Sequence, residues 1–350
     1  MVDSVGSSVV YVSCAESREI DVFRLDTTTG RLSHGGPVAV PGTTEPSPYS
    51  LPLAVSPDRR FMFAALRTQP YPVSSYSIDP EDGSLTHLCI ARLEDTLSYI
   101  TTDRTGRWLF GASVFGGKIL VNAIGTDGLV QGTARQVLPG QTRVHAVLTD
   151  PSNRFAFAAL LGGDKVTQFR FDADEGRLQA NVPDSLVARP GSGPRHLKWH
   201  PTRSDLYIIN EYDGTIDVCS MDPRGGTLEQ RQSVRVTAED FVGEPSAADI
   251  QVTPDGRFLY GSERTSSTIF AFQIDPQTGS LTPRGSTPTE PVPRGFAIDP
   301  AGRFLIAAGI ESHRIAVFAI DATDGRLEPI GTYPTGRMPN WVEILTPPNQ

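Results

Sequence analysis

The sequence predicts an all-β fold in which seven four-stranded units close into a ring, the arrangement known as a β-propeller. Two motifs that recur in step, and short apolar segments without helical periodicity, support this prediction. The first motif is an apolar residue followed by D-x-x-x-G-x-L, shortened to TDGL in the third copy. Its glycines are Gly30, Gly83, Gly128, Gly176, Gly226, Gly279 and Gly325. They lie 53, 45, 48, 50, 53 and 46 residues apart, so seven copies account for the 350 residues.

The second motif, an apolar or polar residue followed by x-P-x-x-R-F, opens each unit after the first. Its third residue is Pro57, Arg104, Pro151, Pro201, Pro254 and Pro300. The segments around the two motifs are short, rich in Val, Ile, Phe and Tyr, and bounded by turn residues, which is typical of strands. We therefore expect four strands in each unit and one domain spanning residues 1–350.

The first unit predicts how the ring closes. Residues 9–40 supply only three strands, and the segment NWVEIL at 340–345 follows the last complete unit. Because an unpaired edge strand is unfavourable, we expect this C-terminal segment to become the missing strand of the first blade.

Composition excludes several classes of protein. The 16 Phe, 9 Tyr and 3 Trp can fill a core, which argues against disorder, and the net charge of −9 argues against binding to nucleic acid. No apolar run approaches the ~20 residues that span a bilayer, and the N-terminus lacks the pattern of a signal peptide. Three widely spaced cysteines fit a reducing compartment. We expect a cytoplasmic protein that is a monomer or a weak homo-oligomer.

Comparison of the residues at the same position in each blade distinguishes residues that build the fold from residues that could bind a ligand. Strand ends alternate between the two faces of the ring, and the motif turns share one face. There an arginine recurs three residues after the reference position, which indicates a structural role in the turn. These arginines are Arg60, Arg107, Arg154, Arg257 and Arg303. His200 also occupies a turn position, so we expect it to be structural.

The opposite face carries two variable columns. Six residues before the reference position stand Leu51, Ser98, His145, Arg195, Ala248 and Arg294. Ten residues after it stand Arg67, Val114, Leu161, Glu211, Arg264 and Ile310. Positions that hold apolar residues in other blades are expected to be buried, and a buried charge needs a partner or a ligand. We therefore expect the charged and imidazole members of both columns to converge at one mouth of the channel.

Arginines outnumber carboxylates in this set, which favours an anionic small molecule as ligand. Ion pairs that only join blades are the alternative. His196 and His313 are expected to be peripheral contacts. The chain has no GxSxG, HExxH, P-loop or GxGxxG motif, and no carboxylate cluster that suggests a metal. We expect neither a metal nor another cofactor.

Four segments resemble one protein family. They are GPRHLKWHP at 193–201, INE at 209–211, PDGRFLYGSERTSSTI at 254–269 and PRGFAIDPAGRFLIAAGIESH at 293–313. They resemble the seven-bladed propeller lactonases, with the bacterial propeller-type 6-phosphogluconolactonases closest and the fungal carboxy-cis,cis-muconate cyclases more distant. The resemblance covers residues 9 to 344. It implies a cytoplasmic hydrolase of acidic lactones, which for a 6-phosphogluconolactonase belongs to the pentose phosphate pathway of carbohydrate metabolism.

The resemblance also implies site residues. The active residues proposed for the cyclases fall on His145, Arg195, Glu211 and Arg264, and Arg294 in PRGF is a further anion contact. Two segments depart from the family pattern, TRVHAVLTDP around His145 and GRMPNW at 336–341. Both departures touch the expected rim of the pocket, so they bear on the identity of the substrate more than on the type of reaction.

The leading hypothesis is hydrolysis of the lactone of an anionic sugar acid. The arginines would hold the phosphate or carboxylate and stabilise the oxyanion, with Arg67 as a further binding residue. Glu211 or His145 would accept a proton from the attacking water. Three alternatives remain open: an aldaric-acid lactonase, a cycloisomerase of a carboxymuconate, and a non-catalytic propeller that binds proteins.

Overall fold

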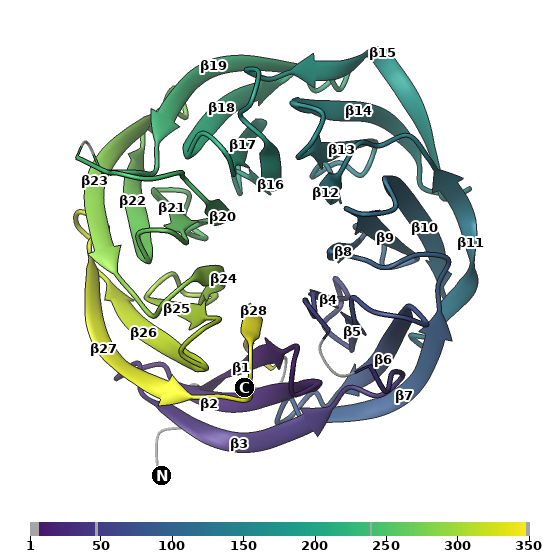
Figure 1. Ribbon diagram of the computed structural model, residues 1–350, viewed down its shortest axis with the longest axis horizontal. Coiled ribbons are helices and arrows are strands. Elements are labelled where there is room, and N and C mark those ends of the chain that lie inside the picture. Colours follow the sequence, from purple (N-terminus) through teal and green to yellow (C-terminus); the bar gives the residue numbers. More distant parts are fainter. Residues whose placement is uncertain (1–6, 46–47, 239, 348–350) are drawn as a thin grey trace.

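The computed structural model describes residues 7–45, 48–238 and 240–347. Within these ranges the chain forms strands and turns and no helix, and the 28 strands make seven antiparallel sheets of four. The sheets stand around a central channel like the blades of a propeller (Figure 1). This confirms the predicted fold class and the predicted number of blades.

Four rings of strands run from the channel outwards (Figure 1). The innermost are β4 (Leu53–Val55), β8 (Tyr99–Thr102), β12 (Val144–Thr149), β16 (Pro194–Trp199), β20 (Ala247–Val252), β24 (Pro293–Ile298) and β28 (Pro339–Leu345). The second are β1 (Ser7–Cys14), β5 (Phe61–Ala65), β9 (Trp108–Ser113), β13 (Phe155–Leu160), β17 (Asp205–Asn210), β21 (Phe258–Glu263) and β25 (Phe304–Gly309). The third are β2 (Glu19–Asp26), β6 (Pro72–Ile78), β10 (Lys118–Ile124), β14 (Lys165–Asp172), β18 (Thr215–Met221), β22 (Thr268–Ile274) and β26 (Arg314–Ile320). The outermost are β3 (Leu32–Ala39), β7 (Leu85–Arg92), β11 (Val130–Leu138), β15 (Arg177–Val187), β19 (Leu228–Arg235), β23 (Leu281–Pro288) and β27 (Leu327–Pro334).

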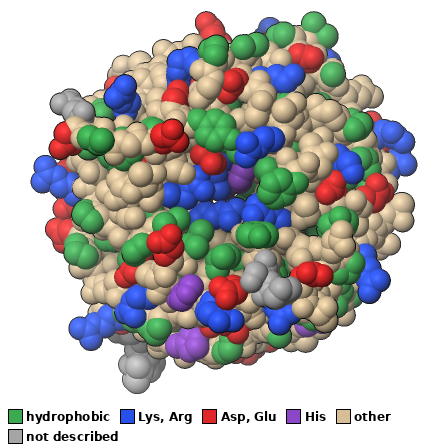
Figure 2. All heavy atoms as spheres, viewed as in Figure 1, with side chains coloured by type: hydrophobic (Ala, Val, Ile, Leu, Met, Phe, Trp, Pro, Cys, Tyr) green, Lys and Arg blue, Asp and Glu red, His purple; other side chains and the backbone are tan. Residues whose placement is uncertain are grey.

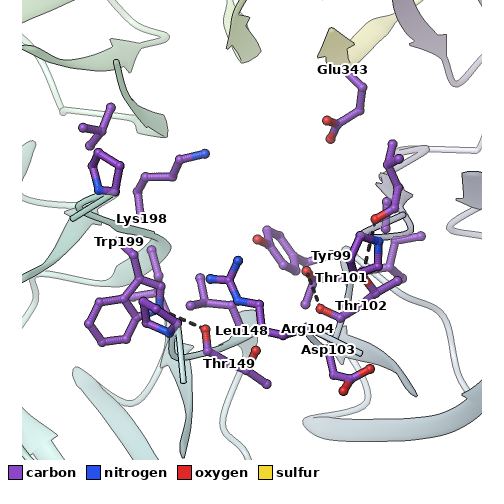
Figure 3. Close-up of a pocket in the computed structure, with 18 of the residues that line it drawn as sticks. Tyr99, Thr101, Thr102, Asp103, Arg104, Leu148, Thr149, Lys198, Trp199 and Glu343 are labelled. Carbon is purple, nitrogen blue, oxygen red and sulfur yellow. Dashed lines mark hydrogen bonds between the residues drawn. The ribbon is translucent and has the colours of Figure 1, made fainter. Parts of the chain in front are cut away.

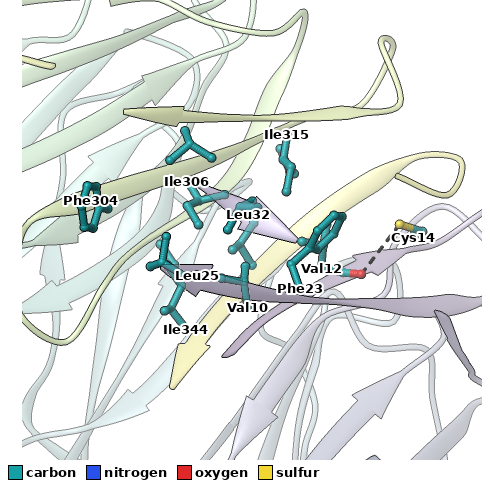
Figure 4. Packing of buried hydrophobic residues seen from close by; sticks show 14 residues of the cluster. Val10, Val12, Cys14, Phe23, Leu25, Leu32, Phe304, Ile306, Ile315 and Ile344 are labelled. Carbon is teal, nitrogen blue, oxygen red and sulfur yellow. Dashed lines mark hydrogen bonds between the residues drawn. The ribbon is translucent and has the colours of Figure 1, made fainter. Parts of the chain in front are cut away.

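The C-terminal strand closes the ring as predicted. The first blade has the order β28-β1-β2-β3, and β28 pairs antiparallel with β1 from Val9↔Leu345 to Cys14↔Pro339. Val342 and Ile344 of β28 are buried in a cluster that joins this blade to the last one, where they pack with Val10, Phe304 and other apolar side chains (Figure 4). The two ends of the chain therefore share one core.

The recurring motifs build the turns of one face. Each D-x-x-x-G glycine adopts a positive φ, for example 74° in Gly279, which favours a residue without Cβ. Its carbonyl also joins neighbouring blades, because Tyr207 Oη donates a hydrogen bond to Gly279 O at 3.0 Å. Three of the recurrent arginines also join blades, since Arg107, Arg154 and Arg257 donate to backbone carbonyl groups of the next blade, and Arg60 and Arg303 stack on the phenylalanine that follows them. The structural role predicted for these arginines is confirmed.

His200 also has the structural role that its turn position predicts. Its Nε2 lies 3.1 Å from Gly256 O of the next blade, and its Nδ1 accepts a hydrogen bond from Thr202 N.

Candidate active site

Three inner strands begin with the same irregularity. In β12, β16 and β24 the pairing with the second strand skips one residue, and the skipped residues are His145, Arg195 and Arg294. Such a β-bulge turns a side chain away from the regular alternation of the strand. Because each bulge lies at the start of an inner strand, the three side chains lie at the same mouth of the channel.

Glu211 joins two arginines at this mouth. It follows the end of β17, and Arg264 follows the end of β21, so both come from the loops between second and third strands. Arg195 Nε lies 2.9 Å from Glu211 Oε2, and Arg264 Nη2 lies 3.0 Å from Glu211 Oε1. The convergence expected of these three residues is thus present in the structure.

The start of β20 holds the same two arginines by its backbone. Arg195 Nη1 donates a hydrogen bond to Ala248 O, and Arg264 Nε donates to Ser246 O at 2.9 Å. Arg195 is only 1% exposed, whereas the side chains of Glu211 and Arg264 are 17% and 19% exposed. Glu211 and Arg264 are therefore the members of this cluster that a molecule in the channel can reach.

Burial and charge act on these groups in opposite directions. Burial alone would raise the pKa of Glu211, but the guanidinium groups of Arg195 and Arg264 outweigh it and the pKa lies below its usual value. Burial, with the nearby Arg264, lowers the pKa of Arg195 to about 10. Glu211 is therefore ionised at neutral pH and contacts two guanidinium groups.

Two further arginines extend the positive charge. Arg294 Nη1 donates a hydrogen bond to Tyr49 O at 3.0 Å, and burial together with Arg195 and Arg67 lowers its pKa well below the usual value. The guanidinium carbon of Arg67 lies 5.6 Å from the ring centroid of Tyr49 and 5.4 Å from that of Phe115. These two rings are 65% and 73% exposed, so Arg67 is held in an aromatic clamp at the rim.

Two histidines lie beside the arginines. The ring centroids of His145 and His196 are 5.1 Å apart, and both side chains are buried. Burial and then Arg195 lower the pKa of His145 well below its usual value, and the same two causes lower the pKa of His196 to about 4 although Asp249 opposes them. Both imidazoles are therefore neutral at pH 7.

An aromatic layer crosses the channel below the arginines. Tyr99 of β8 and Trp341 of β28 have ring centroids 5.5 Å apart. The ring centroid of His196 lies 5.3 Å from that of Tyr99 and 5.8 Å from that of Trp341. We call these three rings the aromatic layer. Tyr99 and Trp341 of this layer also line the cavity in the other half of the channel.

The other half of the channel holds a cavity of about 570 Å³. Lys198 and Glu343 point toward one another across it, and Arg104 and Tyr99 also line it (Figure 3). Burial raises the pKa of Glu343 to about 7, although its hydrogen bond from Trp341 Nε1 at 2.9 Å works in the opposite direction. The cavity also contains Asp103 and His200, and none of the four arginines Arg67, Arg195, Arg264 and Arg294 lines it.

Unsatisfied polar atoms mark the arginine mouth as the better site for a ligand. Among the described residues, buried side-chain atoms with neither a hydrogen bond nor an ion pair include Arg67 Nε, His145 Nδ1 and His196 Nε2. Buried polar atoms in folded proteins are normally bonded, so such a group indicates a place for a ligand. Figure 2 shows a hollow at the centre of one face with Lys and Arg side chains on its walls.

The sequence predicted part of this site and missed part of it. His313 is engaged elsewhere, where its Nδ1 accepts a hydrogen bond from Met338 N at 3.1 Å. Asp249, Tyr99 and Trp341 were missed. The aligned position in this blade holds Ala248, and Asp249 is the next residue. The bulge in β20 includes both residues, so counting six residues back from Pro254 did not reveal Asp249.

Two searches concern other kinds of site. Among the residues that the structure describes, no group of three or more His, Cys, Asp or Glu side chains is placed to hold a metal ion. In the same ranges no helix is long and apolar enough to cross a membrane.

Comparison with known proteins agrees with this geometry. The family described as "Lactonase, 7-bladed beta-propeller" matches residues 6–344. A 6-phosphogluconolactonase of Enterobacter sp. (strain 638) is 38% identical over 287 residues, which cover 82% of this chain and 83% of that protein. A 6-phosphogluconolactonase of Pectobacterium carotovorum is also 38% identical, over 288 residues, with the same two coverages. The periplasmic gluconolactonase of Pseudomonas aeruginosa superposes with a TM-score of 0.89 at 27% identity, covering 98% of this chain and 100% of that one.

Proposed function

Because this chain belongs to the seven-bladed β-propeller lactonase family, we propose that it hydrolyses the lactone of an anionic sugar acid, in the manner of a 6-phosphogluconolactonase. The observation that carries this proposal is the arginine mouth. Four guanidinium groups lie there, those of Arg67, Arg195, Arg264 and Arg294, and among the described residues only Arg195 and Arg264 are paired with a carboxylate, that of Glu211, in a chain whose net charge is −9. A concave site with excess positive charge suits a phosphate or carboxylate.

The arginines have two tasks in this proposal. Arg195 and Arg264, which meet at Glu211, stabilise the negative charge that develops on the carbonyl oxygen when water attacks the lactone. Arg294 and Arg67 lie nearer the rim and hold the phosphate at the other end of the substrate. Glu211 keeps the first two guanidinium groups in place. Because Arg195 engages its Oε2 and Arg264 engages its Oε1, neither carboxylate oxygen is free to take a proton from water.

Proton transfer then falls to the imidazoles. A neutral histidine accepts one proton from the attacking water while the water oxygen bonds to the carbonyl carbon. The tetrahedral intermediate collapses when the ring C–O bond breaks, and the imidazolium returns the proton to the ring oxygen. His145 and His196 lie beside the arginines and are both neutral at pH 7, so either meets this requirement.

The test is a substrate panel with the purified protein. Proton release in a weakly buffered solution would be followed for 6-phosphogluconolactone, gluconolactone and a glucarolactone, with the spontaneous rate subtracted. Loss of ultraviolet absorbance would be followed for a carboxymuconate. We expect the highest kcat/KM for 6-phosphogluconolactone. Rates equal to the spontaneous rate for all three lactones would refute lactone hydrolysis.

A further inference from the structure

Asp249 connects three inner strands through its carboxylate. It lies in β20, and its Oδ1 is 2.8 Å from His196 Nδ1 of β16 and accepts a hydrogen bond from Ile250 N at 2.9 Å. Its Oδ2 accepts a hydrogen bond from Phe296 N of β24 at 3.1 Å. Asp249 is 9% exposed. A carboxylate fixed from three blades has no freedom to reorient.

These contacts determine which nitrogen of His196 carries the proton. Burial by itself would raise the pKa of Asp249, but the hydrogen bonds from His196, Phe296 and Ile250 lower it below its usual value, so the carboxylate is ionised. An ionised carboxylate only accepts hydrogen bonds, so Nδ1 of His196 must be the donor. In a neutral imidazole, Nε2 then carries a lone pair and no proton.

Nε2 of His196 is the atom with nothing to bind. It is buried and has no hydrogen-bond partner among the described residues. A buried acceptor without a partner is unfavourable by about 1–3 kcal/mol, so it is retained where a ligand or a reacting group satisfies it. His196 follows Arg195 in the chain and its ring lies 5.1 Å from that of His145, so it lies next to the arginine mouth, and with Asp249 it lines a cavity of about 280 Å³.

We infer that Asp249 is a positioning residue, which holds His196 in the tautomer whose Nε2 accepts the proton of the attacking water. The inference rests on the proposed lactone hydrolysis and assigns the proton acceptor that the proposal left between two histidines. The O–H bond of water breaks as its oxygen bonds to the carbonyl carbon, and the proton moves to Nε2. The same proton passes to the ring oxygen when the C–O bond breaks, so His196 ends the cycle unchanged.

The decisive variant is Asp249→Asn. The amide keeps an oxygen for the backbone N–H groups, but its NH₂ can donate to Nδ1 and so favour the opposite tautomer of His196. We expect kcat for 6-phosphogluconolactone to fall about 10²–10⁴-fold with KM changed less than about threefold, since Asp249 does not bind the substrate. His196→Gln should show the same loss, and the double variant should lose no more than His196→Gln alone.

A spectroscopic measurement tests the inference without activity. Nitrogen-15 imidazole spectra at pH 7, with His196 assigned through His196→Gln, should show Nδ1–H in the native protein and Nε2–H in Asp249→Asn. Ser262→Ala is the matched control, because Ser262 Oγ accepts the backbone N–H of Asp249 at 2.9 Å but does not touch His196. It should keep kcat within about threefold, whereas an equal loss in this control would indicate a merely structural role.

Each result has a definite meaning. If the native protein hydrolyses no lactone, the proposed function fails, while the spectra still decide whether Asp249 sets the tautomer. An Nε2–H tautomer in the native protein, or an Asp249→Asn variant with the flipped tautomer and undiminished kcat, overturns the inference. If Asp249→Asn does not fold, the native spectrum and the activity of His196→Gln decide, and an active His196→Gln overturns it.

Discussion

Replacement of Glu211 by Gln separates anchoring from proton transfer. The change keeps the shape of the side chain but removes the one charge that Arg195 and Arg264 share. Breaking a buried ion pair from one side costs about 3–5 kcal/mol. Because the amide can still accept a hydrogen bond and the mouth is open to solvent, we expect about 2–3 kcal/mol. For 350 residues, unfolding entropy of about 0.7 kcal/mol/K converts this to a fall in Tm of about 3–4 °C.

Ligand binding should change in the opposite direction. Removal of one negative charge about 8 Å from a bound phosphate, at an effective dielectric constant of about 40, favours the anion by about 1 kcal/mol, or about fivefold in Kd. We therefore expect Glu211→Gln to bind inorganic phosphate more tightly, as measured by calorimetry or by competitive inhibition. Its kcat should fall only about 10–100-fold, because the guanidinium groups are displaced while the proton acceptor is intact.

Asp205→Asn is the control for this experiment. Asp205 is a buried carboxylate paired with Arg203 and Arg231, and it lies on the face of the motif turns. The variant should lose stability but keep its phosphate affinity and its kcat. A Glu211→Gln variant that loses about 10³-fold or more in kcat with unchanged phosphate affinity would refute the reasoning, because this result is expected of a proton acceptor.

Four further predictions concern other parts of the molecule. Ile344→Ala, which deletes a buried side chain of the closing strand, should lower the free energy of unfolding by about 2–5 kcal/mol in urea, whereas Ile90→Ala, at 40% exposure, should change it by less than about 0.5. Arg67→Met should lower kcat/KM about 10–100-fold for 6-phosphogluconolactone and less than about threefold for gluconolactone, and equal losses would contradict a role in phosphate binding. The pKa of Glu343 is raised, so its stabilising effect is complete below pH 4.5 and lost as the pH rises through about 7; Glu343→Gln should therefore raise Tm at pH 8 and not at pH 4. The pKa of His196 is lowered to about 4, so kcat should stay constant from pH 8 to pH 5 and fall below that, and a midpoint near pH 6.5 would contradict the neutral, buried imidazole.

The fold could be predicted almost completely from the sequence because the repeat determines it. Each copy of the two motifs fixes two turns, and the number of copies fixes the number of blades. The closing strand was predicted at 340–345 and observed as Pro339–Leu345. Its position followed from the three strands of the first unit, since a ring of complete sheets leaves no unpaired edge.

The site could be predicted only where the spacing is regular. Arg195, Glu211 and Arg264 occupy aligned positions, and alignment was sufficient to bring them together. Asp249 could not be found in this way, because a bulge in its strand changes the count by a residue and the preceding alanine gave no signal. The contact between Arg67 and its two rings was also beyond reach, since Tyr49 and Phe115 lie in loops without a repeated length.

The aromatic layer has a consequence for how the substrate enters and the product leaves. Its three rings lie within 5.8 Å of one another beside the arginine mouth. A sugar acid that leaves by this mouth passes the guanidinium groups that attracted the lactone, and it carries one more negative charge than the lactone did. The acid would then compete with fresh lactone for the arginine mouth, so we expect inhibition by the product.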